Sequence, residues 1–243
     1  MLIDQIDKRT ANVYGIYGHL GGGKTLTAVE LMVDFLRLGW AVTTNIQLFH
    51  LGRLSERYRY IDDFANVDFW TLPVGAPRGS ESKYRSVIVV DECAEFFDQY
   101  SSTSPQVKSF LSWLRHSSKR GQFVFLIVQQ PEFIAKSLRL LINKWIVCLD
   151  LEQARLPILK IHAPFCRPFV ARRVFDKWGN CISTGLSLAN KVDVGWYYST
   201  SQSIALAGRG DCDNGVAVKR ALPYQQTIFF LGLLYIWWLL YYY

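Results

Sequence analysis

Residues Gly18-His19-Leu20-Gly21-Gly22-Gly23-Lys24-Thr25 match the pattern G-x-x-x-x-G-K-[ST] of a Walker A phosphate loop. The apolar run 13–17 precedes the loop and the amphipathic run 26–38 follows it, which indicates the strand and helix that such a loop needs on either side. Glycines allow the backbone to turn several N–H groups toward phosphate oxygens, and the beginning of the helix adds the positive end of its dipole. The alternative is a glycine-rich turn that matches the pattern by chance.

This loop predicts a site for ATP and Mg²⁺. Lys24 is expected to reach the β- and γ-phosphates, and Thr25 to ligate the metal ion. The residues predicted to contact the nucleotide are Gly18, His19, Leu20, Gly21, Gly22, Gly23, Lys24, Thr25 and Leu26.

An acidic pair is the second half of the predicted site. Residues 87–90 are a continuous β-branched run, typical of a strand buried on both faces, and Asp91 and Glu92 follow it. A phosphate loop of this class needs an acid on a neighbouring strand, so we expect Asp91 to bind Mg²⁺, directly or through water, and Glu92 to polarise the attacking water. This arrangement favours hydrolysis over simple nucleotide storage. The alternative is an acidic helix N-terminus, which is common because anions are stabilised there.

A third apolar run, residues 123–128, ends at Gln129. Pro131 stops the strand shortly afterwards. A glutamine at this position is a candidate sensor beside the γ-phosphate, and the alternative is a polar strand end that meets solvent.

The alternation of strands and helices predicts an α/β fold: a P-loop NTPase with a parallel sheet covered by helices, a small β-containing extension and a C-terminal transmembrane helix. We divide the chain into a P-loop ATPase domain (1–155), the extension or linker (156–220) and the transmembrane helix (221–243). The expected strands are 13–17, 40–45, 69–72, 87–90, 123–128, 146–149, 158–161 and 170–175, and the expected helices are 26–38, 92–99, 107–118 and 132–142. Residues 176–180 are a candidate hairpin turn, and residues 181–220 have no clear pattern.

Charge and the C-terminus indicate the partners. The 243 residues carry a formal net charge of +7 and a pI of about 9.2, which favours an anionic partner, either nucleic acid or a membrane surface. Residues 227–243 contain no charge, and as a helix they would span about 25 Å, close to a hydrocarbon core of about 30 Å. Lys219 and Arg220 precede the uncharged segment, so we expect the N-terminal part to stay cytoplasmic. The alternative is a buried terminal helix, or one packed within an oligomer.

Five segments resemble the zonula occludens toxin N-terminal family, which includes the assembly ATPases of filamentous phages within the wider HerA/FtsK-like translocases. The similarity runs from about residue 12 to residue 202. The segments that carry it are 17–25, 87–92, 125–130, 174–179 and 195–199.

The resemblance implies a Mg²⁺-dependent ATPase in which Lys24 and Thr25 bind the nucleotide, Asp91 and Glu92 serve Mg²⁺ and water, and Gln129 is the sensor. It also implies a ring-shaped homo-oligomer, in which an arginine of one subunit reaches the γ-phosphate held by the next. The candidates for this arginine finger are Arg115, Arg120 and Arg139, and the alternative for each is a solvated or DNA-facing charge.

The implied function is a membrane-anchored ATPase for phage morphogenesis, with phage DNA, coat or assembly proteins, and the host inner membrane or a virion membrane as partners. Family members of filamentous phages usually continue beyond the membrane, whereas this sequence stops at Tyr243. We therefore retain two alternatives for the function: particle extrusion, and genome packaging into a membrane-containing virion. An ATP-switched scaffold that recruits coat proteins is the alternative of another class.

Overall fold

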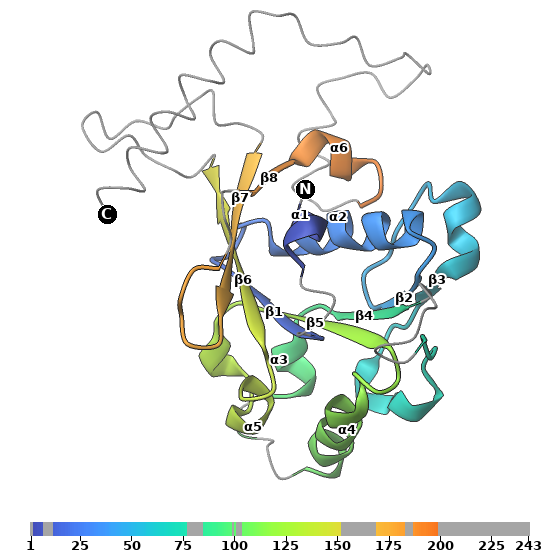
Figure 1. The fold of residues 1–243 in the computed structure, drawn as a ribbon, viewed down its shortest axis with the longest axis vertical. Helices are drawn as coiled ribbons and strands as arrows, with labels where there is room; N and C mark the ends of the chain where they lie inside the picture. The colour runs from blue at the N-terminus through green and yellow to red at the C-terminus, as the bar shows by residue number, and fades with distance from the viewer. Residues whose placement is uncertain are drawn as a thin grey trace, which may run out of the picture. The chain divides into compact units, whose positions relative to one another are not determined.

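The computed structural model describes residues 2–6, 12–76, 85–98, 100, 104–151, 169–182 and 187–198. One compact unit contains Met1–Asp150 and Val170–Tyr198, and its centre is a sheet with the strand order β3-β2-β4-β5-β1-β6-β7-β8 (Figure 1). The strands are β1 (Val13–Tyr17), β2 (Ala41–Thr44), β3 (Tyr58–Tyr60), β4 (Ser86–Val90), β5 (Gln122–Val128), β6 (Lys144–Asp150), β7 (Phe169–Asp176) and β8 (Ser187–Asn190). The helices are α1 (Leu2–Gln5), α2 (Lys24–Arg37), α3 (Cys93–Phe96), α4 (Pro105–His116), α5 (Lys136–Arg139) and α6 (Lys191–Gly195), and the short 3₁₀ turns are η1 (Gly52–Arg57), η2 (Phe64–Asn66), η3 (Phe69–Thr71) and η4 (Pro131–Phe133).

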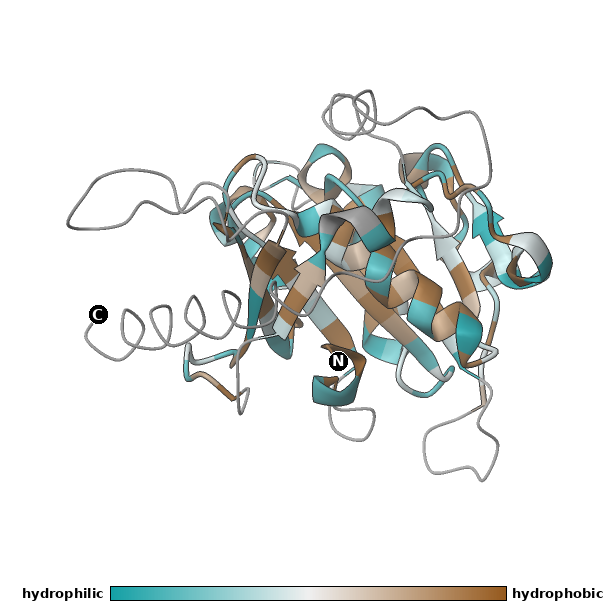
Figure 2. Cartoon of the chain, turned by 90° about the horizontal axis from the view of Figure 1, so that it is seen from above, coloured by the Kyte–Doolittle hydropathy of each residue, from teal (hydrophilic) through white to brown (hydrophobic). Residues whose placement is uncertain are grey.

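Neighbouring strands from β3 across β2, β4, β5 and β1 to β6 all pair in parallel. Strand β7 pairs with β6 in the antiparallel direction. Every residue of β4 and β5 is buried, which agrees with their continuous apolar sequences. Figure 2 shows these apolar positions running along the strands. The predicted α/β class with a mainly parallel sheet is confirmed.

Helices cover both faces of the sheet, with α1, α2 and α6 on one face and α3, α4 and α5 on the other (Figure 1). Successive side chains of a strand point to opposite faces, so β4 contributes Val87 and Val89 to the core under α2 and Ile88 and Val90 to the core under α4. Both cores therefore rest on the same central strands.

Two local predictions were wrong. The strand expected at 69–72 is replaced by the 3₁₀ turn η3 (Phe69–Thr71), because the Asp68 side chain accepts a hydrogen bond from the Trp70 N–H and caps the turn. The helix expected at 132–142 is broken into η4 and the four-residue α5. Between them Ile134 pairs with Asp98, and the Ala135 N–H donates to the Phe97 carbonyl, so the backbone there cannot be helical.

The described part of the predicted extension, residues 156–220, belongs to the same compact unit as the main sheet. Strand β7 pairs along its length with β6, and β8 and α6, which the sequence did not reveal, follow in the same compact unit. The boundary drawn at residue 155 therefore does not separate these strands from the main sheet. Residues 176–180 form the predicted turn, in which the Asp176 side chain accepts a hydrogen bond from the Asn180 N–H.

The predicted transmembrane helix at 221–243 and the predicted strand at 158–161 lie outside the described residues. Among the helices that the structure does describe, none is both long enough and apolar enough to span a bilayer.

Candidate nucleotide-binding site

The phosphate loop links the end of β1 at Tyr17 to the beginning of α2 at Lys24. Gly23, the residue just before the helix, has a φ of +83°, a conformation that favours glycine. A Cβ atom at Gly23 would lie 2.5 Å from Cγ2 of Val170 on β7, so the glycine is also required by close packing. The loop is therefore shaped by the sheet behind it as well as by its own sequence.

Lys24 lies inside this loop. Its ammonium donates to the carbonyl oxygens of Gly18 at 3.0 Å and His19 at 3.1 Å, and the residue is 7% exposed. His19 and Leu20 at the crest of the loop are exposed. The structure thus places a cation and the N-terminus of a 14-residue helix together, an arrangement that attracts phosphate.

Thr25 and Asp91 are in direct contact. The Thr25 hydroxyl donates to Oδ2 of Asp91 at 3.0 Å, which joins the phosphate loop to the acidic turn after β4. We had expected Asp91 on a strand adjacent to β1, but β5 lies between β1 and β4. The phosphate loop and the turn at Asp91 therefore meet across the end of β5. A threonine hydroxyl and a carboxylate are hard oxygen ligands of the kind that Mg²⁺ prefers, so this pair fits the predicted metal site.

Burial raises the pKa of Asp91 to about 6, an effect opposed by hydrogen bonds from the Glu92 N–H and from Thr25. Oδ1 of Asp91 accepts the Glu92 N–H at 2.9 Å. Glu92 itself has a φ of +47°, in the left-handed region, which is unfavourable for a residue with a side chain. Such outliers persist only where the surroundings hold them, and they concentrate at functional sites.

The sequence analysis missed Asn45, which follows β2 at the same edge of the sheet. Its Oδ1 accepts the Asp91 N–H at 2.7 Å, and its Nδ2 donates to the Asp91 carbonyl oxygen at 3.0 Å. The two bonds fix the Asp91 backbone in position and direction. The available signal was a polar residue directly after a strand, at the end where the other strands place their functional side chains.

Gln129 follows β5 and is exposed. The register pairs Val128 with Tyr17, so Gln129 lies beside the start of the phosphate loop. This is the position that a γ-phosphate sensor requires, and the role itself remains a prediction.

The three arginines have different surroundings. Arg120 donates to the carbonyl oxygens of Trp70 at 2.8 Å and Leu72 at 3.4 Å and stacks on the Trp70 ring, so it would have to leave these contacts to act as an arginine finger. Arg120 precedes β5 and Gln129 follows it, so the two residues lie at opposite ends of this strand. Arg139 lies 3.8 Å from Glu132 in a half-exposed ion pair, and Arg115 is exposed in the last turn of α4.

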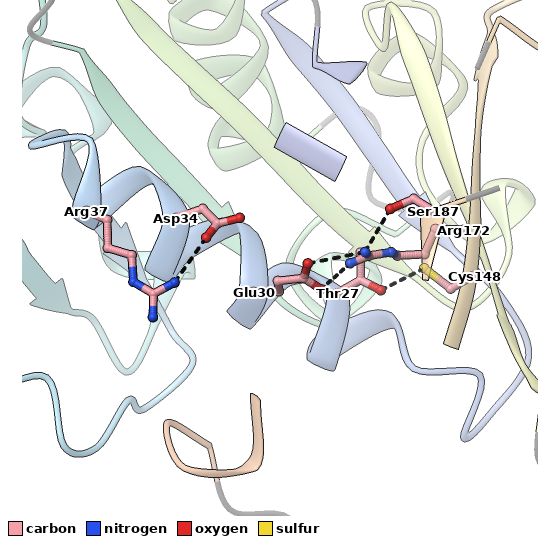
Figure 3. A network of polar contacts seen from close by, with 7 residues as sticks. All are labelled: Thr27, Glu30, Asp34, Arg37, Cys148, Arg172 and Ser187. Atoms are coloured by element: carbon pink, nitrogen blue, oxygen red, sulfur yellow. Dashed lines mark hydrogen bonds and ion pairs between the residues drawn. The ribbon is translucent and has the colours of Figure 1, made fainter. Parts of the chain in front are cut away.

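A buried polar network ties α2 to β6 and β7 (Figure 3). The Arg172 guanidinium, which is 1% exposed, forms a bidentate pair with Glu30 of α2 and donates to the Ser187 hydroxyl at 2.9 Å. Nearby, the Cys148 thiol donates to the Thr27 hydroxyl at 3.3 Å. Because α2 begins with Lys24 and Thr25, these contacts position the nucleotide site.

Comparison with known proteins identifies the family and several phage relatives. The family model described as Zonular occludens toxin (Zot) matches residues 12–162. The Gene 1 protein of Enterobacteria phage I2-2 is 30% identical over 156 residues, which cover 60% of this chain and 42% of that protein. The Gene 1 protein of Enterobacteria phage M13 is 27% identical over 156 residues, which cover 60% of this chain and 44% of that protein. The chain thus spans less than half the length of these curated relatives.

Two solved structures resemble the fold at low sequence identity. The N-terminal domain of zonular occludens toxin from Neisseria meningitidis has a TM-score of 0.45 and 17% identity, covering 78% of this chain and 100% of that one. The genome packaging NTPase B204 from Sulfolobus turreted icosahedral virus 2, in complex with ATP-gammaS, has a TM-score of 0.43 and 13% identity, covering 74% of this chain and 97% of that one.

Proposed function

The chain belongs to the Zonular occludens toxin (Zot) family, and from this membership and the site we propose that it is a Mg²⁺-dependent ATPase that powers phage virion morphogenesis at a membrane. The observation that carries the proposal is the Thr25–Asp91 hydrogen bond, because it unites the two halves of the site that the sequence places 66 residues apart. A chance glycine-rich turn would have no reason to meet the partly buried Asp91.

The residues take distinct parts in hydrolysis. The N–H groups at the beginning of α2 and the Lys24 ammonium bind the phosphates, while Thr25 and Asp91 would hold Mg²⁺. When bound, Mg²⁺ supplies positive charge to the phosphate oxygens. Glu92 accepts a proton from the attacking water and orients it, and Gln129 contacts the γ-phosphate from the end of β5.

Phosphate release by the purified full chain tests the enzyme. Glu92→Gln should bind ATP and hydrolyse it at least about 100-fold more slowly, the range expected for loss of a general base. Lys24→Ala should lose binding as well, whereas Lys136→Ala on α5 is the matched control and should behave as wild type. If the wild-type protein binds ATP without turnover, the ATP-switched scaffold is the better description.

The biological setting rests on separate features. The phage relatives support a role in virion morphogenesis, the net charge of +7 supports DNA as a partner, and the uncharged segment 221–243 supports a membrane anchor with the ATPase domain in the cytoplasm. A homo-oligomeric ring would bring one of the candidate arginines to a neighbouring site. Extrusion and packaging remain alternatives within this proposal.

Two experiments address the setting. If the protein contacts DNA phosphates, its affinity for DNA should fall steeply when the salt concentration rises from about 50 to about 200 mM. An unchanged affinity over this range would exclude binding through phosphate contacts. Complementation of a phage that lacks the gene should fail with Lys24→Ala and succeed with Lys136→Ala. Normal particle yield with Lys24→Ala would exclude a motor that depends on ATP.

A further inference from the structure

An exposed tryptophan lies beside the end of α4. Asp68 caps the turn η3, and the next two residues, Phe69 and Trp70, have opposite surroundings. The Phe69 ring packs in the core against Trp113 of α4, with ring centroids 5.2 Å apart. Trp70 is 44% exposed, although tryptophan is highly buried on average. The buried Phe69 therefore fixes the Trp70 ring at the surface beside α4.

Two side chains hold the Trp70 ring in place. The Arg120 guanidinium carbon lies 5.4 Å from the ring centroid, and Nη2 of Arg120 donates to the Trp70 carbonyl oxygen at 2.8 Å. The ring of His116, the last residue of α4, lies 5.8 Å from the Trp70 ring between centroids. The tryptophan is thus oriented before any partner binds, which reduces the entropy that a partner would have to remove.

The surroundings of this ring are positively charged. Residues 99–131 contain no Asp or Glu and include four cations, Lys108, Arg115, Lys119 and Arg120. Arg115 and Lys119 are exposed, and within the described part of the chain neither side chain forms an ion pair. The carboxylate of Asp68 is engaged by the Trp70 N–H at 3.0 Å. The negative end of α4 favours cations at this position, but it does not account for an exposed tryptophan.

The Trp70 patch comprises Trp70, Arg115, His116, Lys119 and Arg120, and it is separate from the nucleotide site. Arg120 precedes β5, whereas the phosphate loop lies beside the residue that follows β5. The seven residues of this strand span about 20 Å. A partner bound at the Trp70 patch would therefore be distinct from the nucleotide.

Single-stranded nucleic acid fits this combination of an exposed aromatic ring and cations without ion pairs. Bases of a single strand stack on aromatic side chains, and the phosphates of the strand attract Lys and Arg. In a duplex the bases stack on one another and present only their edges in the grooves. The Trp70 ring would then have no base face to stack on, so the ring favours a single strand over a duplex.

We propose that the Trp70 patch binds single-stranded nucleic acid, with a base stacked on the Trp70 ring and phosphates beside Arg115 and Lys119. The inference rests on the proposed function, because it names the surface and the class of strand for the DNA partner proposed there. It takes the DNA-facing alternative for Arg115 and gives Arg120 the part of holding the ring.

Binding of fluorescent oligo(dT) to the full chain in mild detergent, with EDTA and without nucleotide, tests the stacking by anisotropy. Trp70→Ala should weaken binding about 5- to 100-fold, the range expected for loss of stacking on one aromatic ring. Trp70→Phe keeps a ring and should retain most of the affinity. Trp196→Ala is the matched control, because Trp196 is 64% exposed beside a histidine ring and follows α6, on the opposite face of the sheet. This variant should bind as wild type.

Salt dependence separates the phosphate contacts from the stacking. Arg115→Ala/Lys119→Ala should reduce the slope of log affinity against log salt by about 1.4, because each phosphate contact on a single strand contributes about 0.7. Lys108→Ala, near the opposite end of α4, is the control and should keep the wild-type slope. Trp70→Ala should keep it too, since stacking releases no counterion. The double variant also tests the patch if Trp70→Ala does not fold, because both of its side chains are exposed.

Four results would overturn the inference: unchanged affinity of Trp70→Ala for oligo(dT), an equal loss in Trp196→Ala, equally tight binding of a duplex with the same dependence on Trp70, or Trp70-dependent binding to vesicles of anionic lipid without binding to oligo(dT). ATP hydrolysis without DNA is measured on the same protein. Hydrolysis without oligo(dT) binding would overturn this inference and leave the proposed ATPase intact. Trp70-dependent binding without hydrolysis would support the patch and overturn the ATPase.

Discussion

Asp91→Asn should make the nucleotide-free protein more stable at neutral pH. Asp91 is partly buried, and desolvation raises its pKa from 3.8 to about 6. The ionised carboxylate therefore lowers the stability of the folded protein. An asparagine has nearly the same shape, and it can accept the Glu92 N–H through its oxygen and donate to the Thr25 hydroxyl through its amide.

The sign and the size of the effect follow from linkage. Between pH 3.8 and about 6 the folded protein binds the Asp91 proton more tightly than the unfolded chain, so this residue's contribution to stability is fully present below pH 3.8 and is lost as the pH rises to about 6. Each pKa unit corresponds to about 1.4 kcal/mol, which gives a loss of about 3 kcal/mol at pH 7.5. Asparagine does not ionise, so Asp91→Asn should gain about this amount over wild type at pH 7.5 and almost nothing at pH 3.5.

Urea denaturation of the full chain in mild detergent with EDTA, at several pH values, measures the difference. Asp176→Asn provides a control of opposite sign, because hydrogen bonds from Asn180 lower the pKa of the Asp176 carboxyl and its ionised form is the one that the folded protein favours. That variant should lose stability at neutral pH. A gain from Asp91→Asn that does not change with pH, or a loss of stability at pH 7.5, would refute the reasoning.

Three further substitutions test the support of the site. Asn45→Ala removes both hydrogen bonds to the Asp91 backbone, so it should raise the Mg²⁺ concentration needed for half-maximal ATPase activity. Nucleotide binding in EDTA should stay as in wild type. An unchanged Mg²⁺ requirement would contradict a positioning role for Asn45. Arg172→Met should lower the free energy of unfolding by about 3 kcal/mol because it leaves the Glu30 carboxylate unpaired. Arg37→Met removes an arginine whose side chain is 57% exposed from its pair with Asp34, and it should change the free energy of unfolding by less than about 1 kcal/mol. Equal losses would show that burial of the arginine does not matter. Gly23→Ala combines backbone strain with a clash against β7, so it should lower the free energy of unfolding by about 2–4 kcal/mol in thermal or urea denaturation. Gly52→Ala has the same kind of backbone strain but open space around the new Cβ atom, so it should lower the free energy of unfolding by about 1 kcal/mol. Similar losses in the two variants would exclude the packing argument.

Local sequence patterns were sufficient for the parts of the fold and site that depend on near neighbours. The loop at Gly18–Thr25 and the strand that precedes Asp91 were predicted because each motif lies within ten residues and its flanks have a clear period. The helix α4 was predicted at 107–118 and observed as Pro105–His116, with the Ser104 hydroxyl accepting the Val107 N–H as an N-cap.

Contacts between distant segments could not be predicted in this way. No pattern near β2 indicates that Asn45 holds Asp91, because the pairing of β2 with β4 is a property of the sheet order. The insertion of β5 between β1 and β4 is likewise invisible in the sequence, although it decides that Gln129 lies between the loop and the acid. The pair between Glu30 and Arg172 joins residues 142 positions apart, and no local rule connects them.

The extension contributes more to the site than its irregular sequence indicates. Val170 fills the space behind Gly23, and Arg172 holds α2 through Glu30. Both contacts act on the loop or on the helix that begins at Lys24, so strand β7 supports the site. The nucleotide site therefore depends on β7 as well as on the phosphate loop and the acidic turn.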